Sequence, residues 1–214
     1  MDAPAHNLSD RLYDRLRQQI VLHEIAPGQP IRQDVLAKDL GVSKIPLREA
    51  LYRLNADGLV KALANRGFIA APLSAVEADD IFSLRMLIEP PTAAITAVCA
   101  PRTQRDRVAS VYRSLAKLNQ DARESMTARR SIMLALLAED EHPTRLNIAA
   151  TLFDRAERYN QGKAANRPFD MASLLLVVST WLDGDGEGVR SVYRDRLATR
   201  EKIALSTWEY DHGV

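Results

Sequence analysis

The sequence has little that would place the protein outside the cytoplasm or in a membrane. Its single cysteine, Cys99, excludes a framework of disulfide bonds within the chain. No basic segment followed by an apolar run and a cleavage site opens it, and even the apolar segment Leu174–Leu182 falls short of the roughly 18 residues that span a bilayer. With 29 basic and 28 acidic residues, it is no polycation that coats nucleic acid by charge alone. We therefore expect a soluble, cytoplasmic protein without membrane contacts.

The side-chain patterns that carry catalysis are also missing. The sequence holds no Ser/His/Asp or Cys/His arrangement, no glycine-rich phosphate loop and no cluster of metal ligands. The four histidines are scattered over termini and loops, at positions 6, 23, 142 and 212. Cys99 lies in an apolar helical pattern and is expected to be a small core residue. The sequence thus predicts neither an enzyme nor a bound cofactor.

The first part of the chain carries three helical patterns. Apolar residues recur at four-residue steps through Leu8–Glu24, which predicts an amphipathic helix. Arg32–Leu40 predicts a short second helix, and Gly41 supplies the left-handed residue that ends it. A third helix is expected from Ser43 to about Ala56, with the Ser43 hydroxyl as its cap. The sharp turn between the second and third helices indicates a helix-turn-helix.

Two short strands are expected after the third helix. The segments Leu59–Leu63 and Phe68–Ala71 are joined by a tight turn at 64–67, where Asn and Gly can adopt positive φ. Such a hairpin beside a helix-turn-helix is a wing. Ser74 and Glu77 then form a capping box that begins a new helix, so the domain boundary is placed near residue 73.

Everything after this boundary predicts helix. The first of these helices is expected over about Val76–Ala100, interrupted by Pro90-Pro91. We therefore predict a mainly α protein of two domains. Residues 1–73 form a winged helix-turn-helix of three helices and a two-stranded wing, and residues 74–214 form an all-α helical bundle.

Basic residues lie on the leading edges of the first domain. Lys44 and Arg48, four residues apart, share one face of the third helix, while Arg66 lies at the wing tip and Arg32 at the start of the second helix. An α-helix fits the major groove of DNA, where arginine and lysine contact guanine or phosphate. Isolated basic residues on a helix face are usually only solvated. Here their position on three leading edges favours a DNA-reading surface.

Two stretches of this domain resemble the GntR family of bacterial regulators. They are Leu36-Ala-Lys-Asp-Leu-Gly-Val-Ser-Lys-Ile-Pro-Leu-Arg-Glu-Ala-Leu51 and Leu54-x-x-x-Gly58-Leu59-Val60, followed by Asn65-Arg66-Gly67. The resemblance implies that Ser43–Leu54 is the recognition helix, and that Lys44 replaces a more usual arginine. It also implies contacts to operator DNA from Arg32, Ser43, Lys44, Arg48, Asn65, Arg66 and Gly67. A homodimer on a near-palindromic operator, in the bacterial cytoplasm and at the nucleoid when bound, is expected, with repression the commoner outcome.

The helical domain resembles the ligand-binding, FCD-type domain of the FadR subgroup. Its landmarks are Arg85-Met-Leu-Ile-Glu89-Pro, His142-Pro-x-Arg-Leu146 and Asp183-Gly-Asp185. Many members of this subgroup hold a divalent metal with one Asp and three His. The landmark spacing places Arg129, Met133, Leu174 and Arg196 at those positions. Because arginine has no free lone pair and leucine no donor atom, we expect no metal.

Three arginines of this domain, Arg85, Arg129 and Arg196, lie on apolar helix faces. A buried cation requires an anionic partner, and either an acidic side chain such as Glu89 or Asp195 or a ligand carboxylate can supply it. We hypothesise that a small organic-acid effector binds here, at a site formed by Arg85, Arg129, Met133, Leu174 and Arg196. In the alternative, Met133 and Leu174 fill an apolar site, and the helical domain dimerises without sensing a ligand.

Overall fold

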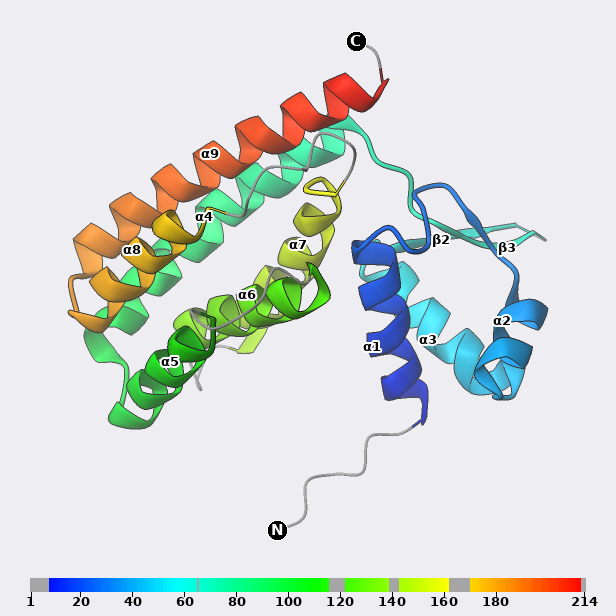
Figure 1. Ribbon diagram of the computed structural model, residues 1–214, viewed down its shortest axis with the longest axis horizontal. Helices are drawn as coiled ribbons and strands as arrows, with labels where there is room; N and C mark the ends of the chain where they lie inside the picture. The colour runs from blue at the N-terminus through cyan, green and yellow to red at the C-terminus, as the bar shows by residue number, and fades with distance from the viewer. Residues whose placement is uncertain (1–7, 65, 116–121, 139–142, 162–169, 213–214) are drawn as a thin grey trace. The chain divides into compact units, whose positions relative to one another are not determined.

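The chain divides into two compact units, residues 1–73 and 74–214 (Figure 1). The computed structural model describes residues 8–64, 66–115, 122–138, 143–161 and 170–212. The fold is mainly helical, with a small sheet in the first unit, in agreement with the predicted fold class.

The first unit is a winged helix-turn-helix. Its elements are α1 (Leu8–Val21), β1 (Pro30–Ile31), α2 (Gln33–Leu40), α3 (Lys44–Ala56), β2 (Val60–Leu63) and β3 (Gly67–Ala70). The sheet has the order β1-β3-β2 and is antiparallel, so that Ile69 pairs with both Pro30 and Lys61. The strand β1 was not predicted from the sequence, because two residues are too short to show the alternation of a strand. The wing therefore has a third strand beside the predicted two.

The core of this unit lies between α1 and α3. The helices α1 and α3 pack together, and Leu16 and Ile20 of α1 and Leu47 and Leu51 of α3 are all buried. Gly41 ends α2 with φ of 65°, in the left-handed region, as predicted. The predicted cap of α3 is wrong in one respect, since Ser43 occupies the cap position but its side chain accepts no capping hydrogen bond. Ser43 is exposed instead.

The second unit consists of helices over its described residues. They are α4 (Ala75–Cys99), α5 (Arg102–Leu115), α6 (Ala122–Leu137), α7 (Pro143–Arg158), α8 (Met171–Leu182) and α9 (Gly186–His212). The two longest, α4 and α9, run side by side in opposite directions (Figure 1). The predicted capping box is present, because the Ser74 hydroxyl accepts a hydrogen bond of 3.1 Å from the Glu77 amide.

The predicted interruption of the first long helix is wrong. Pro90 and Pro91 lie inside a continuous α4. Each proline removes one backbone hydrogen bond, and packing of α4 along α9 supplies tertiary stabilisation that an isolated helix would lack. Pro91 lacks the amide N–H that would donate to the Leu87 carbonyl. Leu87 lies on the exposed side of the helix, where water can solvate freed backbone groups.

The apolar length of α4 bears on the predicted location of the protein. By length and composition alone α4 could cross a membrane, but more than half of its apolar window is buried within the second unit, as in a core helix.

Cys99, expected in the core, is exposed at the end of this helix. The interior of α4 is fixed instead by Thr96, whose hydroxyl donates to the Leu136 carbonyl at 2.6 Å and accepts from the Trp181 indole at 3.0 Å.

Candidate functional site

The first unit presents its basic residues on exposed edges. Lys44 and Arg48 are exposed on α3, Arg32 is exposed at the residue before α2, and Arg66 is exposed in the turn between β2 and β3. Four apolar residues lie on the other side of α3 and are buried, which fixes the basic side outward; they are Leu47, Ala50, Leu51 and Leu54. Asn65, also predicted to contact DNA, lies outside the described residues.

Local contacts hold two of these side chains and shape the turn. The Lys44 ammonium lies 2.5 Å from a carboxylate oxygen of Asp34, and the Arg48 guanidinium donates to the Tyr52 hydroxyl at 3.5 Å. Both contacts are exposed, so Lys44 and Arg48 can each give up its partner for a phosphate at little cost. Gly67 has φ of 82°, which a side chain would strain, so glycine keeps the wing turn tight. Lys44 therefore reaches any other anion in competition with Asp34.

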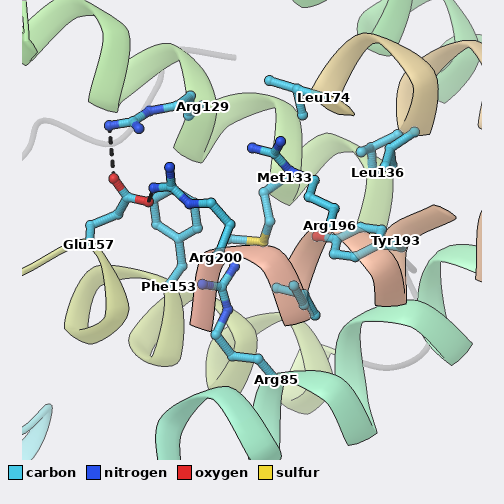
Figure 2. A pocket seen from close by; sticks show the side chains of 12 residues that line it. Arg85, Arg129, Met133, Leu136, Phe153, Glu157, Leu174, Tyr193, Arg196 and Arg200 are labelled. Carbon is cyan, nitrogen blue, oxygen red and sulfur yellow. Dashed lines mark hydrogen bonds and ion pairs between the residues drawn. The ribbon is translucent and has the colours of Figure 1, made fainter. Parts of the chain in front are cut away.

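A small cavity lies inside the second unit, where five helices meet (Figure 2). Its volume is about 30 Å³. The lining side chains come from α4, α6, α7, α8 and α9 and are Arg85, Arg129, Met133, Leu136, Phe153, Glu157, Leu174, Val177, Tyr193, Arg196, Leu197 and Arg200. All five residues predicted to bind an effector are among them. The structure therefore brings these five together at one place, although they are spread along the chain from position 85 to position 196.

Arg85 has an internal partner. Its guanidinium donates to the Glu89 carboxylate at 2.6 and 3.1 Å, and its central carbon lies 5.4 Å from the ring centre of Phe153. The Tyr193 hydroxyl donates to the same carboxylate at 2.8 Å. Burial lowers the pKa of Arg85, but the charge and hydrogen bond of Glu89, together with the charges of Tyr193 and Glu157, offset this, so the pKa is raised. Of the two acids considered from the sequence, Glu89 supplies this partner, whereas Asp195 is exposed.

Arg129 and Arg200 share the carboxylate of Glu157. Figure 2 shows Glu157 between their guanidinium groups, with Arg129 Nη2 at 2.8 Å from Oε2 and Arg200 Nη2 donating to Oε1 at 3.3 Å. Burial raises the pKa of Glu157, but the positive charges of Arg129, Arg200, Arg85 and Arg196 together outweigh burial and hold that pKa below its ordinary value. The carboxylate is therefore ionised at neutral pH and bridges two cations.

Arg196 donates hydrogen bonds to two neutral groups. Its Nη1 contacts the Asp170 carbonyl at 3.2 Å and the Ser173 hydroxyl. Burial and the neighbouring charge of Arg200 lower the pKa of Arg196 to about 10. Among the described residues in and around the cavity, four arginines face the carboxylates of Glu89 and Glu157, and the charge of Asp170 also acts on Arg196, so cations still exceed anions. An anion entering this cavity would be stabilised by charge.

Glu157 and Arg200 were missed from the sequence. Arg200 follows Arg196 by four residues on α9, so both lie on one helix face, and that spacing was a usable signal. Glu157 likewise follows Phe153 by four residues on α7. Its role depends on α6 and α9 lying beside α7, which no local pattern shows.

These side chains do not fit the divalent metal that the FadR-subgroup resemblance implies. At the corresponding positions lie two guanidinium groups, one thioether and one aliphatic side chain, none of which binds a hard or borderline cation. The surplus of positive charge also repels a cation. Over the residues that the structure describes, no group of three or more His, Cys, Asp or Glu side chains is close enough to hold a metal.

Sequence comparisons place the first unit in a family. Residues 8–69 match the family described as "Bacterial regulatory proteins, gntR family". YdhC of Bacillus subtilis, described as an HTH-type transcriptional regulator, is 38% identical over 79 residues, which cover 37% of this chain and 35% of YdhC. The Nta operon transcriptional regulator of Aminobacter aminovorans is 37% identical over 86 residues, 40% of each chain. The chain thus spans well under two thirds of these relatives.

The fold comparison covers both units. E. coli McbR/YncC superposes with a TM-score of 0.81 over 94% of this chain and 99% of its own, at 19% identity. A GntR-type regulator from Rhodococcus sp. RHA1 gives a TM-score of 0.70 over 92% of this chain and 97% of its own, also at 19% identity. At such identities the likeness shows the fold alone. The winged helix-turn-helix thus matches the gntR family over residues 8–69, and its relatives are transcriptional regulators rather than enzymes, as the sequence predicts.

Proposed function

We propose that the protein is an operator-binding transcriptional repressor whose helical unit, an FCD-type domain of the FadR subgroup, senses a small carboxylate and holds two copies together. The gntR-family match over the first unit is the observation that carries the DNA-binding role. The exposed Lys44 and Arg48 of α3 support it, since an α-helix enters the major groove with its leading residues against base edges and phosphates. Such a regulator acts in the cytoplasm, on the nucleoid.

A gel-shift assay against DNA from upstream of the chain's own gene tests this role. Arg48→Ala is expected to weaken specific binding by about 1–3 kcal/mol, or roughly 5- to 150-fold, because a bidentate base contact is lost. Arg113→Ala, which removes an exposed arginine of α5, serves as the control and should leave binding unchanged. Equal affinities of the wild type and Arg48→Ala at moderate salt would contradict the proposal.

The second copy is proposed to cover an apolar stripe on α4. Leu84, Leu87, Ile95 and Val98 lie on one side of this helix, and Leu87 and Val98 are 72% and 67% exposed. A contiguous apolar face of this kind marks an interaction site, and a two-fold axis pairs it with itself. Two recognition helices on one near-palindromic operator likewise require two associated copies of the chain.

Sedimentation of the full chain tests the dimer. Leu87→Asp is expected to shift the protein toward monomer, because a charge would be buried without a partner in the interface. Leu176→Asp, which changes an exposed leucine of α8, is the matched control and should leave the mass unchanged. A wild-type protein that stays monomeric at micromolar concentration would exclude this interface.

The proposed effector is a small organic acid. This proposal is supported by the cavity of about 30 Å³, around which cations exceed anions. An apolar site filled by Met133 and Leu174 would favour the alternative, a domain that only dimerises, but both side chains line an open cavity beside Arg196. The arginine-lined space favours sensing.

Thermal-shift screening of organic acids distinguishes the two. The wild type is expected to be stabilised by at least one acid, and Arg129→Ala and Arg196→Ala should reduce that shift, because each removes a guanidinium that binds carboxylate. Arg113→Ala should behave like the wild type. Identical responses of the wild type and both cavity variants would favour the dimerisation-only alternative.

A further inference from the structure

The cavity already contains a carboxylate between two of its arginines. Glu157 lies 2.8 Å from Arg129 and 3.3 Å from Arg200, and its side chain is buried. The space left beside it is about 30 Å³, whereas a single water needs roughly 10–15 Å³ measured in this way. That space admits two or three waters, or one carboxylate group without a carbon chain. A carboxylic acid of several carbons therefore enters only if a side chain moves.

We propose that Glu157 is an internal competitor of the effector: a small aliphatic carboxylate takes its place between Arg129 and Arg200, and the displacement of Glu157 is passed along α7 to Ser74. This inference rests on the proposed carboxylate-sensing function and adds the mode of binding and its relay.

The charges of the cavity permit this exchange. Glu157 keeps its negative charge when it withdraws, and Asn160, whose amide already donates to it at 3.3 Å, lies on the same segment. Because four arginines line the cavity, positive charge balances an incoming monocarboxylate, so neither acid has to take up a proton. Met133, Leu136 and Leu174 provide apolar walls for a short carbon chain.

The relay consists of contacts at the end of α7. Tyr159 follows Glu157 by two residues, and its hydroxyl donates to the Glu77 carboxylate at 2.8 Å and accepts from the Ser74 amide at 3.2 Å. Arg155, two residues before Glu157, donates to the same carboxylate at 2.6 Å. Ser74 is the first residue of the second unit and caps α4. A shift of the end of α7 therefore acts directly on the segment where the chain leaves the winged helix-turn-helix.

Calorimetric titration of the full chain with acetate, in the absence of DNA, tests the competition. Glu157→Gln keeps the size of the side chain and removes its charge, so it should bind acetate at least tenfold more tightly than the wild type. Asp154→Asn removes a buried carboxylate one turn earlier on α7, where it pairs with Arg130 at 2.9 Å outside the cavity, and should leave acetate affinity unchanged. Acetamide should bind to none of them. Equal or weaker acetate binding by Glu157→Gln overturns the inference.

Two further variants complete the test. If Glu157→Gln does not fold, Glu157→Asp decides, because it withdraws the carboxylate by one methylene and should also bind acetate more tightly. Tyr159→Phe should keep wild-type acetate affinity but lose the effect of acetate on the gel shift. An acid that binds the wild type in the screen, without tighter binding by the Glu157 variants, defeats the competition and leaves the proposed function intact. Absence of any acid binding defeats both the competition and the proposed carboxylate sensing.

Discussion

Removing the charge of Glu89 isolates the energetics of the buried ion pair at the cavity. Arg85 and Glu89 are four residues apart on α4, and their side chains are 7% and 0% exposed. Glu89→Gln keeps the shape of the side chain but leaves the Arg85 cation without its anion. The amide oxygen that this substitution introduces can still accept a hydrogen bond from Arg85 or Tyr193, but the amide nitrogen then faces a donor.

The expected cost is large on the scale of domain stability. Breaking a buried ion pair by removing one partner destabilises a protein by about 3–5 kcal/mol, since the remaining charge stays desolvated. For a chain of this length, about 1 kcal/mol lowers Tm by roughly 2–4 °C. Glu89→Gln should therefore lower the Tm of the helical unit by roughly 6–20 °C. Combining it with Arg85→Met removes the uncompensated cation and should recover most of this loss.

Arg102 and Asp106 on α5 provide a matched control. They have the same spacing on a helix, but their side chains are 94% and 74% exposed and lie 3.8 Å apart. Asp106→Asn should cost below about 0.5 kcal/mol, because water screens an exposed pair. Thermal unfolding followed by circular dichroism measures both variants against the wild type. Similar losses for Glu89→Gln and Asp106→Asn would refute the argument from burial.

Three further changes test other parts of the structure. The pKa of Glu157 is held below its ordinary value of 4.5, so the ionised carboxylate stabilises the fold above about pH 4.5, and this contribution is lost as pH falls through the lowered pKa. Urea unfolding measured against pH should show this contribution in the wild type and not in Glu157→Gln. Thr96→Val leaves the Trp181 indole without its acceptor and should cost about 1–3 kcal/mol by urea unfolding, against little for the exposed Thr199→Val. Gly41→Ala, at φ of 65°, should cost about 1–2 kcal/mol in the same assay, and an unchanged midpoint would contradict the left-handed turn.

The winged helix-turn-helix was predictable because its signals are local. Helix periodicity, a left-handed glycine after α2 and a tight wing turn each lie within about ten residues of sequence. The strand β1 was not predictable, because two residues pair with β3 only after the chain has folded back. Ser43 was expected to cap α3 through its hydroxyl, yet its side chain accepts no capping hydrogen bond.

The cavity was predictable only in part, for a related reason. An arginine on an apolar helix face is visible in one helix, so Arg129 and Arg196 could be identified before their surroundings were known. Their partners come from other helices. Glu157 binds Arg129 of α6 and Arg200 of α9 from α7, and such pairing follows from helix packing rather than from any spacing within one segment. The continuous α4, with Pro90-Pro91 inside it, shows the same override of a local rule by tertiary packing.

The arginines also give a physical account of how a cavity of this kind could bind carboxylates without a metal. A divalent cation at the centre of such a site would contribute its positive charge from one point, whereas here the positive charge comes from four arginines on three helices. Guanidinium groups offer planar pairs of donors from fixed helices, whereas a metal offers open coordination positions. Such a site has to balance its cations when no ligand is bound, and Glu157 does so between Arg129 and Arg200. The internal carboxylate thus follows from the same excess of charge that would attract the effector.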